Sequence, residues 1–174
     1  MIEYLKKIAL ILGFFALSLH VFSQCEILYR VYPGGMMEYY MEPVNFYWTR
    51  DKSLRGCIVT DKENYYLALL PLPFPAKPAG QKLKNDLKMT LSDGNTCSLK
   101  FSDTRYIDKD TVMQMLYLIK KNDLNNLLTL QVVDVTLDMM GTEGMRTYTF
   151  KLHKSALKEQ LDCFLKKKDE KQKQ

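Results

Sequence analysis

The segment Leu87–Phe101, LKMTLSDGNTCSLKF, shows most clearly which fold class this chain adopts. Apolar and polar residues alternate on both sides of Ser92–Asn95, and a period of two predicts strands with one buried face. The Asp-Gly pair between the two runs is typical of a tight hairpin turn. We therefore expect an antiparallel β-hairpin here.

The same alternation continues toward both ends of the chain, interrupted by two helical patterns. The segment from Val112 to Ile119 fits a strand, although a helix through Asp110 and Thr111 fits it nearly as well. Besides these segments, the expected strands are 26–32, 36–41, 44–49, 54–60, 64–70, 133–137 and 146–152, and the expected helices are 121–128 and a final one from Ser155.

The final helix carries an apolar stripe. Leu157, Leu161, Phe164 and Leu165 are spaced at i, i+4, i+7 and i+8, so they fall on one helical face that must be buried. The sequence therefore predicts an α+β fold, in which antiparallel β-sheet carries a short helix and a C-terminal helix packed on the sheet.

The 174 residues correspond to one domain behind a short apolar lead. We expect a signal peptide over 1–23, a single β-rich domain over 24–165, and a disordered lysine-rich tail over 166–174. The segment 71–78, PLPFPAKP, holds four prolines and predicts a stiff connector, because proline cannot donate to a sheet. Docking of this segment into a partner's aromatic groove is the alternative.

The lead has the order of a secretory signal peptide. Lys6 and Lys7 precede the apolar run Ile8–Leu19, and Ser23 fits a cleavage site before Gln24. An uncleaved anchor and a lipoprotein attached at Cys25 are the alternatives. We expect a secreted or periplasmic protein with no stable membrane insertion after cleavage.

The four cysteines all follow this lead, which predicts disulfide bonds. We expect Cys57–Cys97 within the sheet and Cys25–Cys163 between the two ends of the domain, although four cysteines allow three pairings. No C-x-x-C pair is present, so neither a thioredoxin-like site nor a paired-cysteine zinc site is predicted.

The chain resembles small secreted proteins of unknown function from Bacteroidetes-type bacteria. The residues that carry this resemblance are Val21–Gln24, Ser92–Asn95 and Leu157–Cys163. The likeness covers the lead and residues 82–165. It implies export, and it implies no catalytic residue, because no activity is attached to the pattern.

The net charge of +5 is concentrated at the two ends of the chain, five of the lysines lying in 166–174. A basic folded face is the usual mark of a nucleic-acid-binding protein. Since the body of this chain is close to neutral, we expect no nucleic-acid partner.

No residue pattern indicates catalysis. His153 is the only histidine after the lead, and no Gly-x-Ser-x-Gly motif is present to accompany it. Asp134 and Asp138 lie about 13 Å apart if both are on one strand, too far for a glycosidase pair. The group of aspartates at 103, 108 and 110 lacks the pattern of a calcium loop. We expect no metal site and no cofactor.

A cluster of aromatic residues within ten positions is the best candidate for binding. Of its members, Tyr39, Tyr47 and Trp48 are the predicted ligand-binding residues, because exposed rings stack on sugars and partner proteins. Core and edge packing is the alternative. The sequence thus predicts an exported, disulfide-stabilised binding or interaction module whose partner is a protein or a glycan. An exported hydrolase that uses carboxylates is the second hypothesis.

Overall fold

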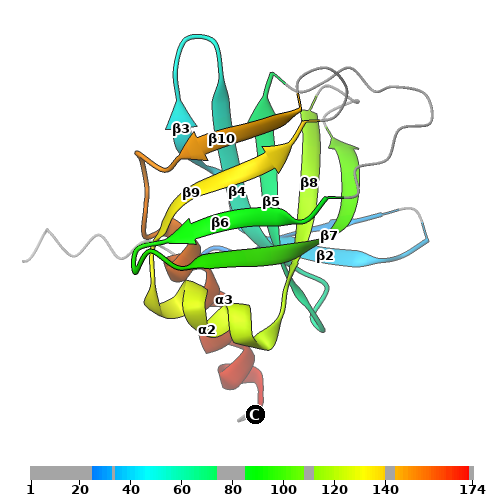
Figure 1. Cartoon of the computed structure of the whole chain (residues 1–174). Helices are drawn as coiled ribbons and strands as arrows, with labels where there is room; N and C mark the ends of the chain where they lie inside the picture. Colours follow the sequence, from blue (N-terminus) through cyan, green and yellow to red (C-terminus); the bar gives the residue numbers. More distant parts are fainter. Residues whose placement is uncertain (1–24, 33, 74–84, 108–111, 140–143, 173–174) are drawn as a thin grey trace, which may run out of the picture.

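A computed structural model describes residues 25–32, 34–73, 85–107, 112–139 and 144–172 (Figure 1). The predicted signal peptide and most of the proline-rich connector lie outside these described residues. Pro71 still belongs to a strand, where it is paired with Leu54, so the connector begins later than expected.

The fold is an antiparallel β-sheet of ten strands, ordered β1-β2-β4-β5-β8-β7-β6-β9-β10 with β3 beside β4. This corrects the predicted α+β class, because every predicted strand joins the same sheet and the helices are minor elements. The strands are β1 (Leu28–Val31), β2 (Met37–Tyr40), β3 (Val44–Trp48), β4 (Ser53–Thr60), β5 (Tyr65–Leu72), β6 (Leu87–Leu91), β7 (Thr96–Ile107), β8 (Val112–Ile119), β9 (Val132–Asp138) and β10 (Met145–Thr149), and the helices are α2 (Lys121–Thr129) and α3 (Ala156–Gln172).

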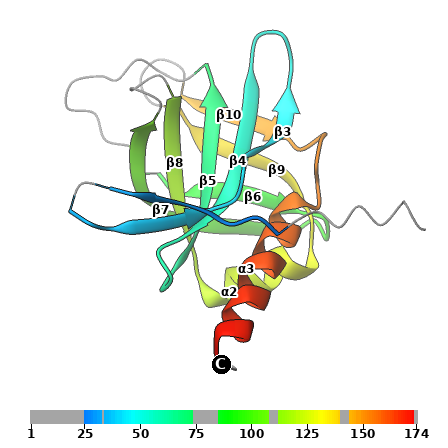
Figure 2. The same ribbon diagram turned by 180° about the vertical axis from the view of Figure 1, so that it is seen from behind.

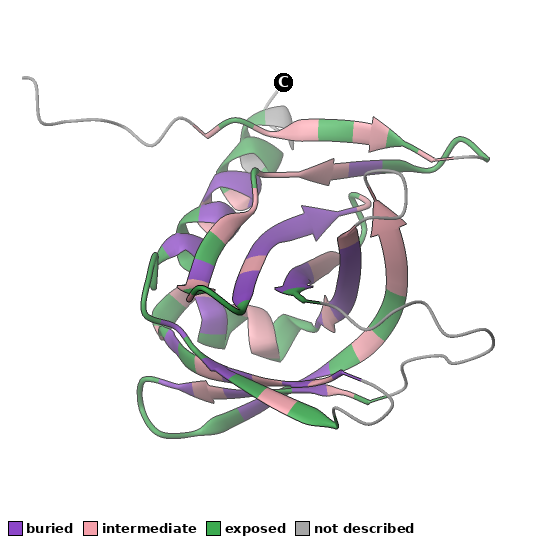
Figure 3. Ribbon diagram, turned by 90° about the horizontal axis from the view of Figure 1, so that it is seen from above, coloured by how far each residue is buried: buried purple, intermediate pink, exposed green. Residues whose placement is uncertain are grey.

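The sheet curls round on itself until β10 comes next to β3 (Figure 3). The long strand β7 makes the bend, since its first part pairs with β6 and its second part with β8. Beyond β10, the backbone N–H groups of Lys151 and Leu152 donate to the carbonyl of Phe46 in β3 at 2.9 and 3.1 Å. The rings of Phe46 and Phe150 stack beside this junction with centroids 4.2 Å apart.

The curled sheet encloses the main core, and α2 and α3 lie across one end of it (Figure 1). The alternation in β8 is typical: Met113, Met115 and Tyr117 face this core. Leu116 faces the outer side of the sheet. There it packs with Cys57, and Tyr40 of the β1–β2 hairpin packs against them. The segment 112–119 is therefore a strand, and the helical alternative is excluded.

Helix α3 docks as predicted, with Leu157, Leu161 and Phe164 buried in the main core. Gln160 adds a polar attachment, because its Oε1 accepts from the backbone N–H of Ile58 in β4 at 2.7 Å. This N–H lies where the pairing of β4 passes from β3 to β2, so the side chain fills a gap between two ladders. No helix among the described residues is long and apolar enough to cross a lipid bilayer.

The helix is longer than expected. It runs to Gln172, so the lysine-rich segment after Leu165 continues the helix where a disordered tail was predicted. The lysines of this segment are good helix formers, and they extend the exposed face of a helix already fixed by its buried stripe.

We expect Leu161→Ala to lower the free energy of unfolding by about 2–5 kcal/mol, the range for emptying a fully buried leucine site. Leu161 has no exposed surface and belongs to the main core. Urea unfolding of this variant, compared with Lys158→Ala on the exposed face of the same helix, measures the difference. Equal losses in the two variants would contradict the docking of α3.

The predicted disulfide between Cys25 and Cys163 is confirmed, whereas the predicted pairing of Cys57 with Cys97 is wrong. Cys57 faces the outer side of β4, and Cys97 faces the main core from β7. The strands β5 and β8 lie between β4 and β7, and the two thiols belong to separate clusters on opposite sides of the sheet. Both cysteines are therefore free and buried.

Candidate functional site

A groove of about 550 Å³ lies between the β1–β2 hairpin, the β4–β5 turn and the last turns of α3. These elements lie at the end of the curled sheet that α3 covers (Figure 2). The volume falls in the range of small-molecule sites. The groove's apolar lining consists of Ile27, Tyr29, Tyr39, Tyr65 and Phe164.

The groove is anchored where α3 meets the sheet. The ring of Phe164 on α3 meets the ring of Tyr65 on β5 edge to face, with centroids 6.2 Å apart. Thr60 also lines the groove, but its hydroxyl donates to the carbonyl of Asn64 at 2.7 Å and is therefore occupied in holding the turn. The groove wall at this point is thus apolar and firmly positioned.

The hairpin presents an apolar face. Its register places Tyr29 opposite Tyr39 and Val31 opposite Met37, so these four side chains share one side of the two strands. Tyr29 is 65% exposed and Val31 is 60% exposed. The row of side chains thus continues from the groove toward the hairpin tip, where Met36, the residue before β2, is also exposed.

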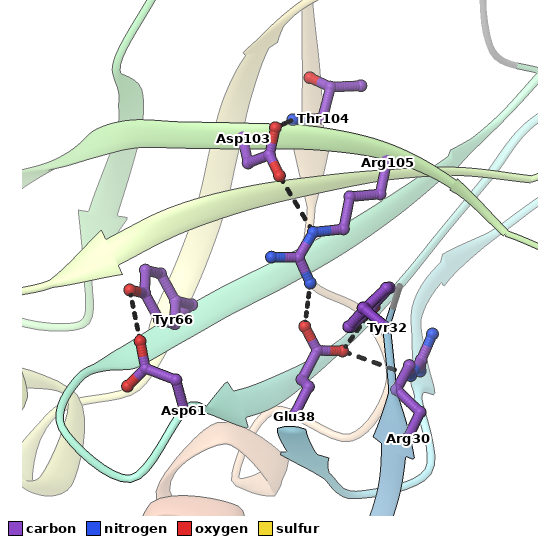
Figure 4. Close-up of polar contacts among 8 residues, drawn as sticks. All are labelled: Arg30, Tyr32, Glu38, Asp61, Tyr66, Asp103, Thr104 and Arg105. Atoms are coloured by element: carbon purple, nitrogen blue, oxygen red, sulfur yellow. Dashed lines mark hydrogen bonds and ion pairs between the residues drawn. The ribbon is translucent and has the colours of Figure 1, made fainter. Parts of the chain in front are cut away.

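The opposite face of the hairpin is ionic and buried (Figure 4). Glu38, only 4% exposed, lies between two arginines: Arg30 Nε is 3.3 Å from Oε1, and the guanidinium of Arg105 from β7 contacts Oε2. Tyr32 also donates its hydroxyl proton to Glu38 at 3.0 Å. Through Arg105, the cluster fixes the hairpin to the sheet and so holds its apolar face outward.

The β4–β5 turn is held by Asp61. Its Oδ1 accepts from the backbone N–H groups of Glu63 and Asn64 at 2.9 and 2.7 Å, and its Oδ2 accepts from the Tyr66 hydroxyl at 3.0 Å. Partial burial alone would raise the pKa of Asp61, but these hydrogen bonds outweigh it and lower the pKa. The carboxylate is thus committed to the turn.

This turn places Lys62 at the groove with φ of +82°, a left-handed conformation that is unfavourable for residues other than glycine. The ammonium of Lys62 lies 5.2 Å from the centre of the Tyr39 ring, within the range of a cation–π contact. Lys167 and Lys168 on α3 line the groove as well. All the charged residues that line it are therefore cationic.

A second hollow, of about 440 Å³, lies beside the Cys25–Cys163 disulfide. Four carboxylates line it, and three of these belong to exposed residues. They are Glu26, Glu42, Glu159 and Asp162. This hollow thus differs from the first groove in charge, although both border α3.

The three aromatic residues singled out by sequence lie on two strands. Tyr39, on β2, lines the groove. Tyr47, on β3, meets Tyr148 edge to face with centroids 5.5 Å apart, which is the packing alternative. Trp48 is 68% exposed at the end of β3. Binding of a protein or a glycan at Trp48 stays a prediction.

The groups considered for catalysis do not converge in the described part of the chain. Burial raises the pKa of the Cys57 and Cys97 thiols to about 12, with the Asp123 carboxylate adding to the effect at Cys97, so neither ionises near neutral pH. His153 is exposed in the turn before α3, and its carbonyl accepts from the N–H of Ala156.

The carboxylates give a similar result. Asp134 accepts a hydrogen bond from Thr90, and Asp103 pairs with Arg105 at 3.0 Å. The remaining members of the predicted aspartate group, 108 and 110, lie outside the described residues. Among the described residues, no three side chains of the metal-binding types are grouped to hold an ion.

Of the residues that line the groove, sequence reasoning identified only Tyr39 as a binding residue, and it missed the others, among them Tyr29, Lys62, Phe164 and Lys167. Phe164 was recognised only as part of the buried stripe, and Lys167 was assigned to a disordered tail. The signal that was available is the alternation of 28–31 and 37–40, which leaves one apolar face of the hairpin without a partner.

Comparison with known proteins adds no assignment: no protein family, no curated protein and no solved structure matches this chain significantly.

Proposed function

We propose that this protein is an exported binding module without catalytic activity, and that it holds an apolar ligand group in the groove between the β1–β2 hairpin and α3. The observation that carries the proposal is a concave, aromatic-lined surface continuous with an exposed apolar hairpin face. Exposed apolar surface of this kind is unfavourable in water and typically marks a binding site.

The disulfide supports the proposal in two ways. It joins Cys25 at the start of the hairpin to Cys163, the residue before Phe164, and therefore links two sides of the groove. Disulfides persist in oxidising compartments, which agrees with the export expected from the lead.

A hydrolase is the second candidate function, and the second hollow is its place, because four carboxylates line that surface. A general acid is normally a carboxyl group held in a buried environment. Glu26, Glu42 and Glu159 are exposed, which favours binding over hydrolysis.

Titration with the uncharged fluorophore N-phenyl-1-naphthylamine tests the groove. We expect saturable binding of one molecule per chain, and Tyr29→Asp should weaken this binding at least tenfold, because it places a charge on the apolar wall. Tyr29 is largely exposed, so the variant should remain folded.

Trp48→Ala is the matched control, since Trp48 is an equally exposed aromatic residue on another strand. It should bind the fluorophore like the wild-type protein. Loss of binding in Trp48→Ala and not in Tyr29→Asp would overturn the assignment of the groove.

A further inference from the structure

The charge of the groove indicates what kind of ligand it takes. Three lysines line it and no carboxylate does, whereas the neighbouring hollow is rich in carboxylates. Within the described residues, Lys62, Lys167 and Lys168 form no ion pair. An unpaired cluster of cations beside apolar walls is complementary to an anion that carries an apolar body.

Lys62 gives an independent indication. Its left-handed backbone conformation would suit glycine better, and such strain is found where a side chain is needed for function. The neighbouring Asp61 does not pair with it, because that carboxylate accepts hydrogen bonds from Glu63, Asn64 and Tyr66. Among the described residues, the Lys62 ammonium therefore lines the groove without an ion-pair partner.

The hairpin shows how far the apolar part of the ligand extends. From Tyr29 and Tyr39, which line the groove, the apolar face continues to Val31 and Met37, about 7 Å further along the strands. A flexible alkyl chain could follow this row while its head group stays near the lysines.

We infer that the groove binds single anionic amphiphiles, that is, an alkyl chain with a carboxylate, sulfate or phosphate head group. This inference rests on the proposed function, since it names the ligand class of the same groove. A concave groove can hold one alkyl chain, whereas a flat bilayer surface cannot enter it. The ligand in this inference is therefore a free amphiphile molecule and not a membrane surface.

The test compares three probes of equal chain length below their micelle concentrations: decanoate, decan-1-ol and decyltrimethylammonium. Each displaces the bound naphthylamine fluorophore from the full-length protein. We expect decanoate to bind at least tenfold more tightly than decanol, and the cationic probe to bind most weakly, because charge-assisted contacts with the lysines form only with decanoate.

Lys62→Gly gives the second measurement. It relieves the left-handed strain, so the melting temperature should not fall, while the affinity for decanoate should fall about tenfold and that for decanol should stay unchanged. Lys158→Met, on the exposed face of α3, is the control for losing a lysine charge away from the groove. It should leave the affinities for decanoate and decanol unchanged. Methionine is used at this position because glycine would weaken the helix.

In the displacement assay, two results would overturn the inference and leave the proposed function standing. These are equal affinities for decanoate and decanol, or displacement by decanoate that is unaltered in Lys62→Gly. Co-sedimentation with phosphatidylglycerol vesicles in the absence of any binding of monomeric decanoate would also overturn it, in favour of a membrane surface. Failure of the naphthylamine fluorophore itself to bind would remove the proposed function.

Discussion

Reduction of the Cys25–Cys163 disulfide is expected to lower the free energy of unfolding by about 5 kcal/mol. The bond joins residues separated by 138 positions, and the entropy of closing so long a loop in the unfolded chain gives a value of this size. A domain of this length is usually stable by only about 5–15 kcal/mol, so the reduced protein should be close to unfolding. Urea unfolding of the oxidised and the dithiothreitol-treated protein measures the difference.

The two remaining cysteines provide the control for this experiment. Cys57 and Cys97 are free and buried, so a Cys57→Ala, Cys97→Ala variant keeps the disulfide and should lose much less stability. The same variant shows that any effect of the reductant comes from the Cys25–Cys163 bond. Identical unfolding curves for the oxidised and reduced forms would contradict the expected contribution.

Reduction should also weaken ligand binding before the protein unfolds. Cys163 directly precedes Phe164 in α3, and Cys25 lies two residues before Ile27. Phe164 and Ile27 both line the groove. Without the disulfide, the start of β1 is no longer tied to α3, and the two walls can separate. Stability and ligand affinity are therefore coupled through this bond.

Local patterns in the sequence predicted the individual strands well. The hairpin around Asp93 and Gly94 forms as expected, because alternation and turn chemistry act over a few residues. The curl of the sheet was not predictable in the same way. It depends on the bend of β7 and on the contact between Phe46 and Phe150, which are far apart in sequence.

The cysteine pairing also depends on long-range packing that local patterns do not reveal. Cys25 and Cys163 meet because α3 packs beside the start of the hairpin, and that position is set by the whole sheet. For Cys57 and Cys97, alternation alone assigns each residue to a face of its own strand. Only the strand order shows that the two faces are opposite sides of the sheet.

The candidate site was the least predictable part. Its aromatic residue Tyr39 was identified from the aromatic cluster, but its partners come from the N-terminal strand, a turn and the last helix. Nothing in the segment around Lys62 indicates a left-handed lysine, because aspartate and asparagine are the residues expected at such positions. The long-range packing of three elements determines the groove.

The buried ionic cluster under the hairpin leads to the second large effect. Glu38→Ala is expected to lower the free energy of unfolding by about 3 kcal/mol, the lower end of the range for breaking a buried ion pair. The lower end applies because Arg30 and Arg105 keep 24% and 21% of their side-chain surface exposed, so water partly compensates for the lost carboxylate.

Three further variants separate the charge from the packing in this cluster. Glu63→Ala, in the exposed β4–β5 turn, is the control and should change stability by less than about 0.5 kcal/mol. Glu38→Gln keeps an acceptor for the Tyr32 hydroxyl and should lose less than Glu38→Ala, because the side-chain volume is retained. Replacing Glu38, Arg30 and Arg105 together by leucine removes the whole cluster, and apolar replacement of a complete buried ionic cluster is often close to neutral. This triple variant should therefore be more stable than Glu38→Ala. Equal losses in Glu38→Ala and Glu63→Ala would show that other contacts hold the hairpin.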